Sequence, residues 1–187
     1  MGKRLVDLLL AGLVLVPLLP VAALVAIAVR ASSRGPALYW SDRVGADERI
    51  FRMPKFRTMR LGTPVVATHL ISDPHAALTP IGGFLRRTSL DEIPQLWSVL
   101  AGDMSLVGPR PALFNQVDLI ALRREAGVDG LRPGITGWAQ INGRDELPIP
   151  VKVALDREYR DRRSLWFDLR IMVVTAAKLL GDKTVTH

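Results

Sequence analysis

Residues 8–29 read LLLAGLVLVPLLPVAALVAIAV, 22 consecutive residues without a charged or hydrogen-bonding side chain. A straight helix of this length would measure about 33 Å, enough to cross a hydrocarbon core of roughly 30 Å. Such a stretch cannot stay in water without a partner surface. The sequence therefore predicts a helical segment that enters a membrane.

Two prolines, Pro17 and Pro20, lie near the middle of this segment. Each proline removes a backbone hydrogen bond and crowds the preceding turn, so we expect a bend that leaves two arms too short to span. Basic residues flank the segment on both sides, at Lys3 and Arg4 and at Arg30 and Arg34. Because basic residues favour the cytoplasmic side, the pattern predicts a re-entrant helix-break-helix hairpin. A kinked helix that still spans is the alternative, and the run is long for a cleaved signal peptide.

Composition narrows the chemistry that the chain can perform. Its 187 residues suit one domain, 49% of them are hydrophobic, and the formal net charge is +7. The basic residues follow no nucleic-acid-binding pattern, so we expect no nucleic acid partner and favour anionic lipid and phosphorylated substrates. With no cysteine and three histidines, a thiolate nucleophile is excluded and a carboxylate is the remaining candidate for covalent catalysis.

A pair of adjacent carboxylates, Asp91 and Glu92, stands in the stretch SLDEIPQLW at residues 89–97. Pro94 conflicts with a helix capped by Ser89, because it would fall inside that helix. We therefore expect a helix that begins near residues 91–93, with the pair at its positive end. Free backbone N–H groups there would keep Asp91 ionised and hold a phosphate. The alternative is that the two acids merely complement the helix dipole.

Basic side chains recur around this pair in the sequence. The candidates for phosphate binding are Lys55, Arg57, Arg86, Arg87, Arg110 and Arg144. Arginine binds phosphate oxygens two at a time, and a cationic cleft concentrates anionic substrates. Pro109 and Pro111 stiffen the backbone on both sides of Arg110, which indicates a phosphate clamp. Lys55 and Arg57 would share one side of an extended strand, although a solvated basic strand is an equal interpretation.

The remaining sequence predicts helices over residues 113–126, from residue 151 onward and over residues 164–180. Asp156 with Arg160 and Glu158 with Arg162 have the favourable i, i+4 order for ion pairs. The last helix suits either a membrane interface or a core. We predict an α+β fold that is mainly helical and forms one membrane-embedded domain, with a hairpin at 1–30 and a catalytic part at 31–187.

The chain resembles bacterial sugar transferases of the monotopic phosphoglycosyl transferase family, in their minimal form, over almost its whole length. The matching segments are Lys3-Arg4 with Asp7, Gly35-Pro36, Arg43-Val44-Gly45, and residues 54–59, 78–82, 85–97, 102–111 and 133–144. One departure is that Leu19 precedes Pro20 where many members carry Ser-Pro, which leaves the place of the bend open.

The resemblance implies transfer of a sugar 1-phosphate from a UDP-sugar to undecaprenyl phosphate at the cytoplasmic face of the bacterial inner membrane, with release of UMP. It implies that Asp91 forms a phosphosugar-aspartyl intermediate and that Asp91 and Glu92 bind Mg²⁺ or assist the second attack. Asp156 and Asp168 match family positions that orient the basic groups, and Gln140 and Asn142 are candidate sugar or uridine contacts.

Two rival functions stay open, together with the question of a homo-oligomer. A membrane-anchored module that binds anionic lipid without chemistry would release no UMP. A polytopic transferase would need several spans, and the sequence contains one candidate segment.

Overall fold

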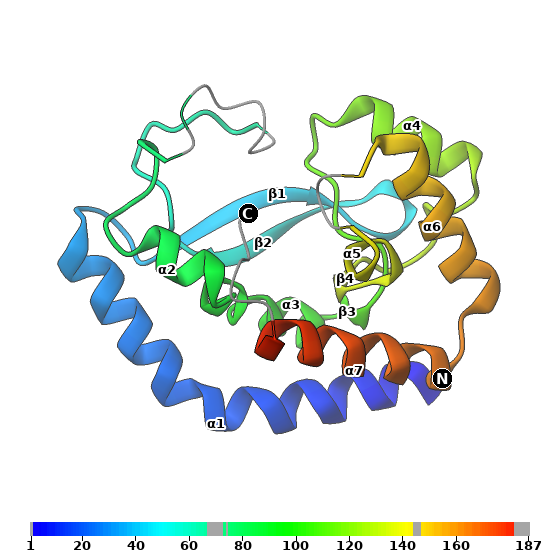
Figure 1. Ribbon diagram of the computed structural model, residues 1–187, viewed down its shortest axis with the longest axis horizontal. Helices are drawn as coiled ribbons and strands as arrows, with labels where there is room; N and C mark the ends of the chain where they lie inside the picture. The colour runs from blue at the N-terminus through cyan, green and yellow to red at the C-terminus, as the bar shows by residue number, and fades with distance from the viewer. Residues whose placement is uncertain (1, 67–72, 74, 144–146, 182–187) are drawn as a thin grey trace.

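The computed structural model describes residues 2–66, 73, 75–143 and 147–181. It shows a mixed α/β fold dominated by helices, as predicted. The longest element is α1 (Gly2–Ser32), which runs beneath the rest of the molecule and bends near its middle (Figure 1). The other elements form two small sheets with helices around them.

Helix α1 is one uninterrupted helix that contains both prolines. The expected break between two helices is therefore a bend within one helix. Among the described helices, α1 alone is long and apolar enough to cross a membrane by length and composition. Its outward residues, including Leu9, Leu13 and Leu24, are 64%, 71% and 68% exposed. These side chains form a long apolar surface that the described part of the chain leaves uncovered.

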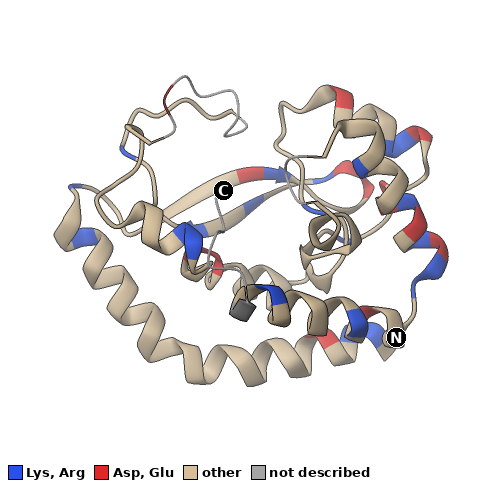
Figure 2. Ribbon diagram, viewed as in Figure 1, with Lys and Arg blue, Asp and Glu red and all other residues tan. Residues whose placement is uncertain are grey.

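Both arms of α1 pack against the same side of the domain. Ala11, in the first arm, belongs to a core cluster with Phe51, Met53 and Val99, while Val25 and Val29 in the second arm pack with Phe56, Leu85 and Ile93. The two arms thus cover adjoining parts of one surface. Figure 2 shows that Lys and Arg lie toward the ends of α1 and are absent from its middle.

The first two turns of α1 make polar contacts with three other elements. Lys3 Nζ donates to Asp168 Oδ2 at 2.6 Å, and Asp7 accepts from Ser105 Oγ at 2.8 Å. Arg4 donates to the carbonyl of Val99 at 2.7 Å and to that of Leu100 at 3.1 Å. Lys3 and Arg4, which the sequence suggested as topology signals, are therefore also tertiary contacts.

Two two-stranded sheets form the centre of the domain. Strands β1 (Leu38–Val44) and β2 (Ile50–Phe56) pair antiparallel and are joined through the 3-10 turn η1 (Ala46–Glu48). Strands β3 (Ser105–Val107) and β4 (Gly134–Thr136) pair in parallel. Strand β2 ends at Phe56, one residue before Arg57, and the two basic side chains bind different partners: Lys55 binds Glu92, and Arg57 binds backbone carbonyl groups.

Short helices follow β2 and carry the candidate site. They are α2 (Gly82–Arg87), the 3-10 turn η3 (Leu90–Glu92) and α3 (Gln95–Ala101). The prediction that a helix begins at residues 91–93 was wrong. Pro94 is the N-cap of α3, and the two carboxylates lie on the separate turn before it. Gly102, with φ of 101°, ends α3, since glycine adopts this left-handed conformation without a side-chain clash.

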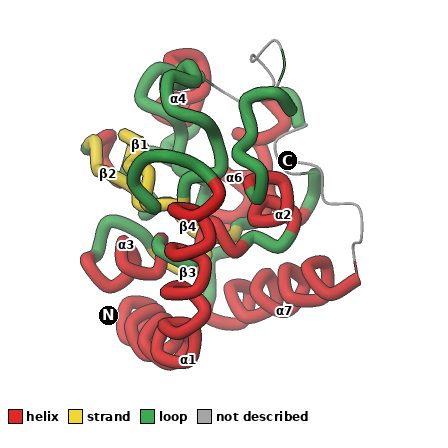
Figure 3. The backbone as a smooth tube through the Cα atoms, turned by 90° about the vertical axis from the view of Figure 1, so that its left-hand side faces the viewer, coloured by secondary structure: helices red, strands yellow, loops and turns green. Residues whose placement is uncertain are grey.

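The C-terminal half contains α4 (Val117–Glu125), α5 (Trp138–Ile141), α6 (Ile149–Arg162) and α7 (Leu165–Gly181). Helix α4 starts four residues later than predicted, because the Gln116 side chain accepts from the Leu113 backbone N–H in a turn before the helix. Figure 3 shows α7 beside α1 along the same side of the molecule. Leu165, Trp166 and Val173 on α7 are exposed, while Phe167 and Ile171 are buried.

Candidate functional site

The carboxylate pair Asp91 and Glu92 forms a dyad. It lies on η3, shortly before α3. Ser89, the residue before η3, has φ of 56°, a left-handed conformation that costs free energy for a residue with a side chain. It makes no side-chain cap, so the capping-box alternative does not form. The strained turn and Pro94 together let both carboxylates lie outside a regular helix.

Glu92 is held by two basic side chains from distant parts of the sequence. Lys55 Nζ on β2 donates to Glu92 Oε1 at 2.8 Å, and Arg110 Nη1 lies 3.7 Å from the same oxygen. Burial favours the neutral acid, but Lys55 and Arg110 outweigh it and lower the pKa of Glu92 to about 2. Glu92 is therefore ionised at every physiological pH.

Asp91 has a different electrostatic environment from its neighbour. Its side chain is buried, and this burial raises the pKa of Asp91 to about 6, although Lys55, Arg86 and Arg110 oppose the rise. The helix start expected at Asp91 does not form, and desolvation raises the pKa of this carboxyl where a positive helix end would have lowered it. At neutral pH the carboxylate is still mostly ionised, and its poor solvation makes it more reactive toward an electrophile.

Arg86 completes the group of cations around the dyad. It extends from α2, and its Nε donates to Thr58 Oγ1 at 3.1 Å. Burial lowers the pKa of Arg86, and the charge of Asp91 opposes that shift. Lys55, Arg86 and Arg110 thus come from three separate elements to one pair of carboxylates, as the sequence suggested.

Other predicted site residues are placed elsewhere. Arg57 is buried, and its guanidinium donates to the carbonyl groups of Pro36 at 2.8 Å and Ser33 at 3.0 Å, so it secures the end of α1. Arg87 is exposed at the end of α2, and Arg144 lies outside the described residues. The structure gives Arg57 no role at the dyad.

The two aspartates expected to orient basic groups lie in separate buried networks. Asp168 binds Lys3 and accepts a hydrogen bond from the Tyr159 hydroxyl at 2.7 Å; burial, and after it this hydrogen bond, raise the pKa of that tyrosine. Asp156 binds Arg123 instead of Arg160, at 2.7 Å. Burial raises the pKa of Asp156 while Arg123 opposes the shift. The second predicted pair, Glu158 with Arg162, does form.

The candidate sugar contacts lie on or next to α5. Gln140 donates to the carbonyl of Ile135 at 2.9 Å, while its buried Oε1 has no hydrogen-bond partner among the described residues. Asn142 is exposed and donates to the carbonyl of Trp138 at 2.8 Å. A hydrogen-bond donor on a bound ligand, or on another residue of this protein, could satisfy Gln140 Oε1.

Two buried polar residues, Arg123 and Gln95, were not among the predicted site residues. Gln95 is buried and hydrogen-bonds to Glu92. Arg123 is buried on α4, four residues after Leu119, the other buried residue of that helix. A charge on the inward face of a helix is a signal that could have been read in the sequence.

An anionic phosphate group fits this arrangement of two carboxylates among three cations, in a domain attached to an apolar helix. The geometry defines a candidate phosphoryl-transfer site. The chain belongs to the bacterial sugar transferase family, whose model matches residues 1–182.

Curated relatives agree with this assignment. A UDP-glucose:undecaprenyl-phosphate glucose-1-phosphate transferase of Xanthomonas campestris pv. campestris is 41% identical over 98% of this chain and 40% of its own length. An undecaprenyl-phosphate glucose phosphotransferase of Komagataeibacter xylinus is 41% identical over 92% of this chain and 35% of its own length. The chain thus spans about two fifths of these relatives. An uncharacterized sugar transferase of Bacillus subtilis (strain 168), EpsL, is 39% identical over 98% of this chain and 89% of its own length.

Proposed function

We propose that this protein transfers a sugar 1-phosphate from a UDP-sugar to undecaprenyl phosphate and releases UMP, as the first membrane step in the synthesis of a surface glycan. The observation that carries the proposal is the geometry of the dyad, in which Lys55 Nζ lies 2.8 Å and Arg110 Nη1 lies 3.7 Å from Glu92 Oε1, next to the buried carboxylate of Asp91. The printed names of the relatives support the donor and acceptor classes.

In the first step a carboxylate oxygen of Asp91 attacks the β-phosphorus of the UDP-sugar. A bond forms between that oxygen and phosphorus, the bond from phosphorus to the bridging oxygen breaks, and UMP leaves with the electron pair. Arg86 and Arg110 lie near enough to influence the charge of Asp91 and can stabilise the phosphate oxygens as charge develops on them. The product is a phosphosugar-aspartyl intermediate.

In the second step a phosphate oxygen of undecaprenyl phosphate attacks the same phosphorus. The bond between phosphorus and Asp91 breaks, which restores the carboxylate and leaves the sugar on a lipid diphosphate. The acceptor phosphate attacks as its dianion, so no proton is transferred in this step and Glu92 stays ionised. Lys55, at 2.8 Å from Glu92, keeps that carboxylate oriented through both steps.

A magnesium ion fits the donor set. The described residues contain no group of three or more metal-binding side chains, but Mg²⁺ in phosphoryl-transfer sites commonly binds one or two carboxylates together with substrate phosphates. Asp91 and Glu92 would hold it, and it would neutralise charge on the donor diphosphate. A site that depends on the substrate phosphates for ligands predicts weak metal binding in their absence.

The bent helix supports a re-entrant position in the cytoplasmic leaflet of the bacterial inner membrane. Both arms of α1 pack on one side of the domain, and a helix that crossed the bilayer would carry one arm away from it. Helices α1 and α7 run along that side (Figures 1 and 3), and both carry exposed apolar residues. This arrangement would hold the dyad where a soluble nucleotide sugar meets a lipid phosphate.

The test is UMP release by the full chain in lipid nanodiscs, with undecaprenyl phosphate and a panel of UDP-sugars that begins with UDP-glucose. We expect one donor to give turnover, Asp91→Asn to abolish it, and Asp118→Asn, an exposed acid on α4, to leave it unchanged. Mass spectrometry after quenching should find the phosphosugar on the peptide that contains residue 91. Absence of UMP with every donor would favour the lipid-binding module, and turnover by the Asp91→Asn variant would remove the covalent step.

A further inference from the structure

The segment that carries Arg110 is fixed through its backbone carbonyl groups. Four consecutive carbonyls, at residues 109–112, each accept a hydrogen bond from another part of the chain. The donors are the Gly134 N–H to Pro109 at 2.9 Å, Arg123 Nη1 to Arg110 at 2.9 Å, Arg43 Nη1 to Pro111 at 3.0 Å and the Val44 N–H to Ala112 at 2.9 Å. Two of these donors are backbone groups and two are arginine side chains.

The sequence explains why side chains are needed here. Pro109 and Pro111 have no N–H group, so the segment cannot form a regular ladder of backbone hydrogen bonds with a neighbouring strand. A carbonyl left without a donor in this interior would cost free energy. The Arg110 carbonyl is satisfied by the guanidinium of Arg123, which reaches it from α4.

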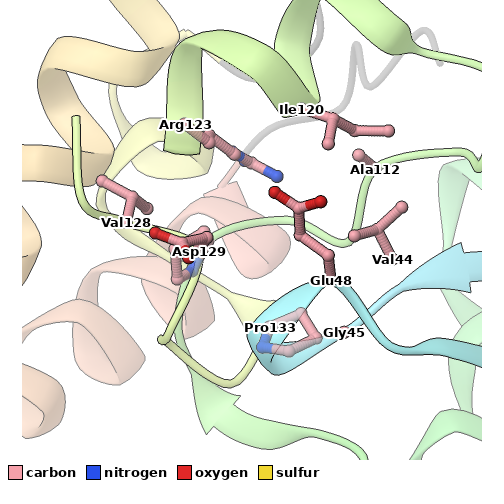
Figure 4. A pocket seen from close by; sticks show the side chains of 10 residues that line it. Val44, Gly45, Glu48, Ala112, Ile120, Arg123, Val128, Asp129 and Pro133 are labelled. Carbon is pink, nitrogen blue, oxygen red and sulfur yellow. The ribbon is translucent and has the colours of Figure 1, made fainter. Parts of the chain in front are cut away.

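Arg123 is itself held by a buried carboxylate. Its Nε and Nη2 atoms donate to Asp156 Oδ2 at 2.9 Å and 2.7 Å, and Asp156 is 1% exposed. The same guanidinium therefore connects Asp156 on α6 to the Arg110 backbone. Figure 4 shows Arg123 extending from α4 into a small pocket that Val44, Ala112 and Pro133 also line.

We propose that Arg123, held by Asp156, is a positioning residue that sets the place of Arg110 beside Glu92. This inference rests on the proposed function, because it concerns the orientation of a phosphate-binding arginine. In this proposal the basic group that Asp156 orients is Arg123. A buried ion pair that only stabilises the fold is the competing explanation, and the two differ in whether the pair acts through Arg110.

The kinetic test compares Arg123→Lys, Arg110→Lys and the double variant in nanodiscs. Lysine keeps the charge of Arg123 but lacks the planar fork that reaches two partners at once. We expect Arg123→Lys to lower kcat/KM by about 10- to 100-fold. The double variant should be no worse than Arg110→Lys alone, because a residue that acts through Arg110 has nothing further to position. Independent losses that multiply in the double variant would overturn the inference.

The matched control is Arg160→Lys. Arg160 also donates to backbone carbonyl groups, those of Ala126 and Gly127, and binds a carboxylate, Asp161, but contacts no residue of the 109–112 segment. Arg160→Lys should change kcat/KM by less than about twofold, and by the same factor in the wild-type and Arg110→Lys backgrounds. Asp156→Asn serves as the second variant if Arg123→Lys does not fold, with the same dependence on Arg110 expected.

A structural readout decides the inference even without turnover. The amide hydrogens of Gly134 and Val44 bond to the carbonyls on either side of Arg110, so a loosened segment should exchange them about tenfold faster or more in Arg123→Lys. Arg160→Lys should leave both rates unchanged. Unchanged exchange in Arg123→Lys, or equal acceleration in the control, would overturn the inference. Failure of the wild-type chain to release UMP would overturn the proposed function alone.

Discussion

Lys55 Nζ lies 2.8 Å from Glu92 Oε1, and this ion pair joins strand β2 to the dyad. The two side chains are 16% and 21% exposed, so the pair is only partly screened by water. It keeps Glu92 ionised, while Asp91 next to it has a raised pKa. Two adjacent carboxylates thus have separate protonation behaviour, which suits one nucleophile and one permanent anion.

The rate of the first step should depend on the ionisation of Asp91. Since its pKa is about 6, the rate of UMP release should fall about tenfold per pH unit below that value and level off above it. The measurement is the burst of UMP without lipid acceptor, because an acceptor phosphate also titrates near pH 6. A flat profile between pH 5 and 8, with the protein still folded, would contradict the assignment of Asp91.

Asp91→Asn should stabilise the protein at neutral pH while it removes activity. The folded-state pKa of Asp91 exceeds its ordinary value of 3.8, so the ionised carboxylate opposes folding above pH 6 and this penalty is lost as the pH falls toward 3.8. The expected gain at pH 7.5 is at most about 3 kcal/mol. Unfolding temperatures at pH 7.5 and pH 4 measure it, and Asp118→Asn provides the control. Equal gains at both pH values would contradict this account.

Lys55→Met should disturb Glu92 and reduce turnover. Without Lys55, Glu92 retains the more distant Arg110 and a hydrogen bond from Gln95. We expect destabilisation by about 1–3 kcal/mol and at least a tenfold loss in kcat/KM. Lys55→Arg, which keeps the charge, should retain more of the stability and more of the kcat/KM than Lys55→Met. The prediction fails if the methionine and arginine variants have the same activity.

Lys3 and Asp168 should couple helix α1 to helix α7. Their atoms are 2.6 Å apart and Asp168 is 4% exposed, so Lys3→Met would leave a buried carboxylate with the Tyr159 hydroxyl as its remaining described partner. We expect a loss of about 1–3 kcal/mol, reduced when Asp168→Asn is combined with it. The exposed pair Glu158 and Arg162 is the comparison, and Arg162→Met should cost about 1 kcal/mol or less. If Lys3→Met and Arg162→Met lower the free energy of unfolding by the same amount, the coupling role of Lys3 is contradicted.

Much of the site could be predicted from sequence because its signals are local. Asp91 and Glu92 are adjacent, Pro94 excludes a helix capped by Ser89, and the residues flanking Arg110 are prolines. Burial is not local, and for this reason the raised pKa of Asp91 was not foreseen. The turn η3 does not itself cover the Asp91 carboxylate. Elements from other parts of the chain pack over η3 and bury it.

The sequence by itself determined the apolar helix at the N-terminus, the dyad, the end of α3 at Gly102 and the amphipathic helix α7. Each depends on the residue types and their spacing within one segment. Only the tertiary structure decided that Arg57 secures the end of α1, that Asp156 pairs with Arg123 instead of Arg160, and that Lys3 and Arg4 contact α7 and α3. A charged side chain finds its partner across the fold, so its role follows from which elements pack together and not from its neighbours in the chain.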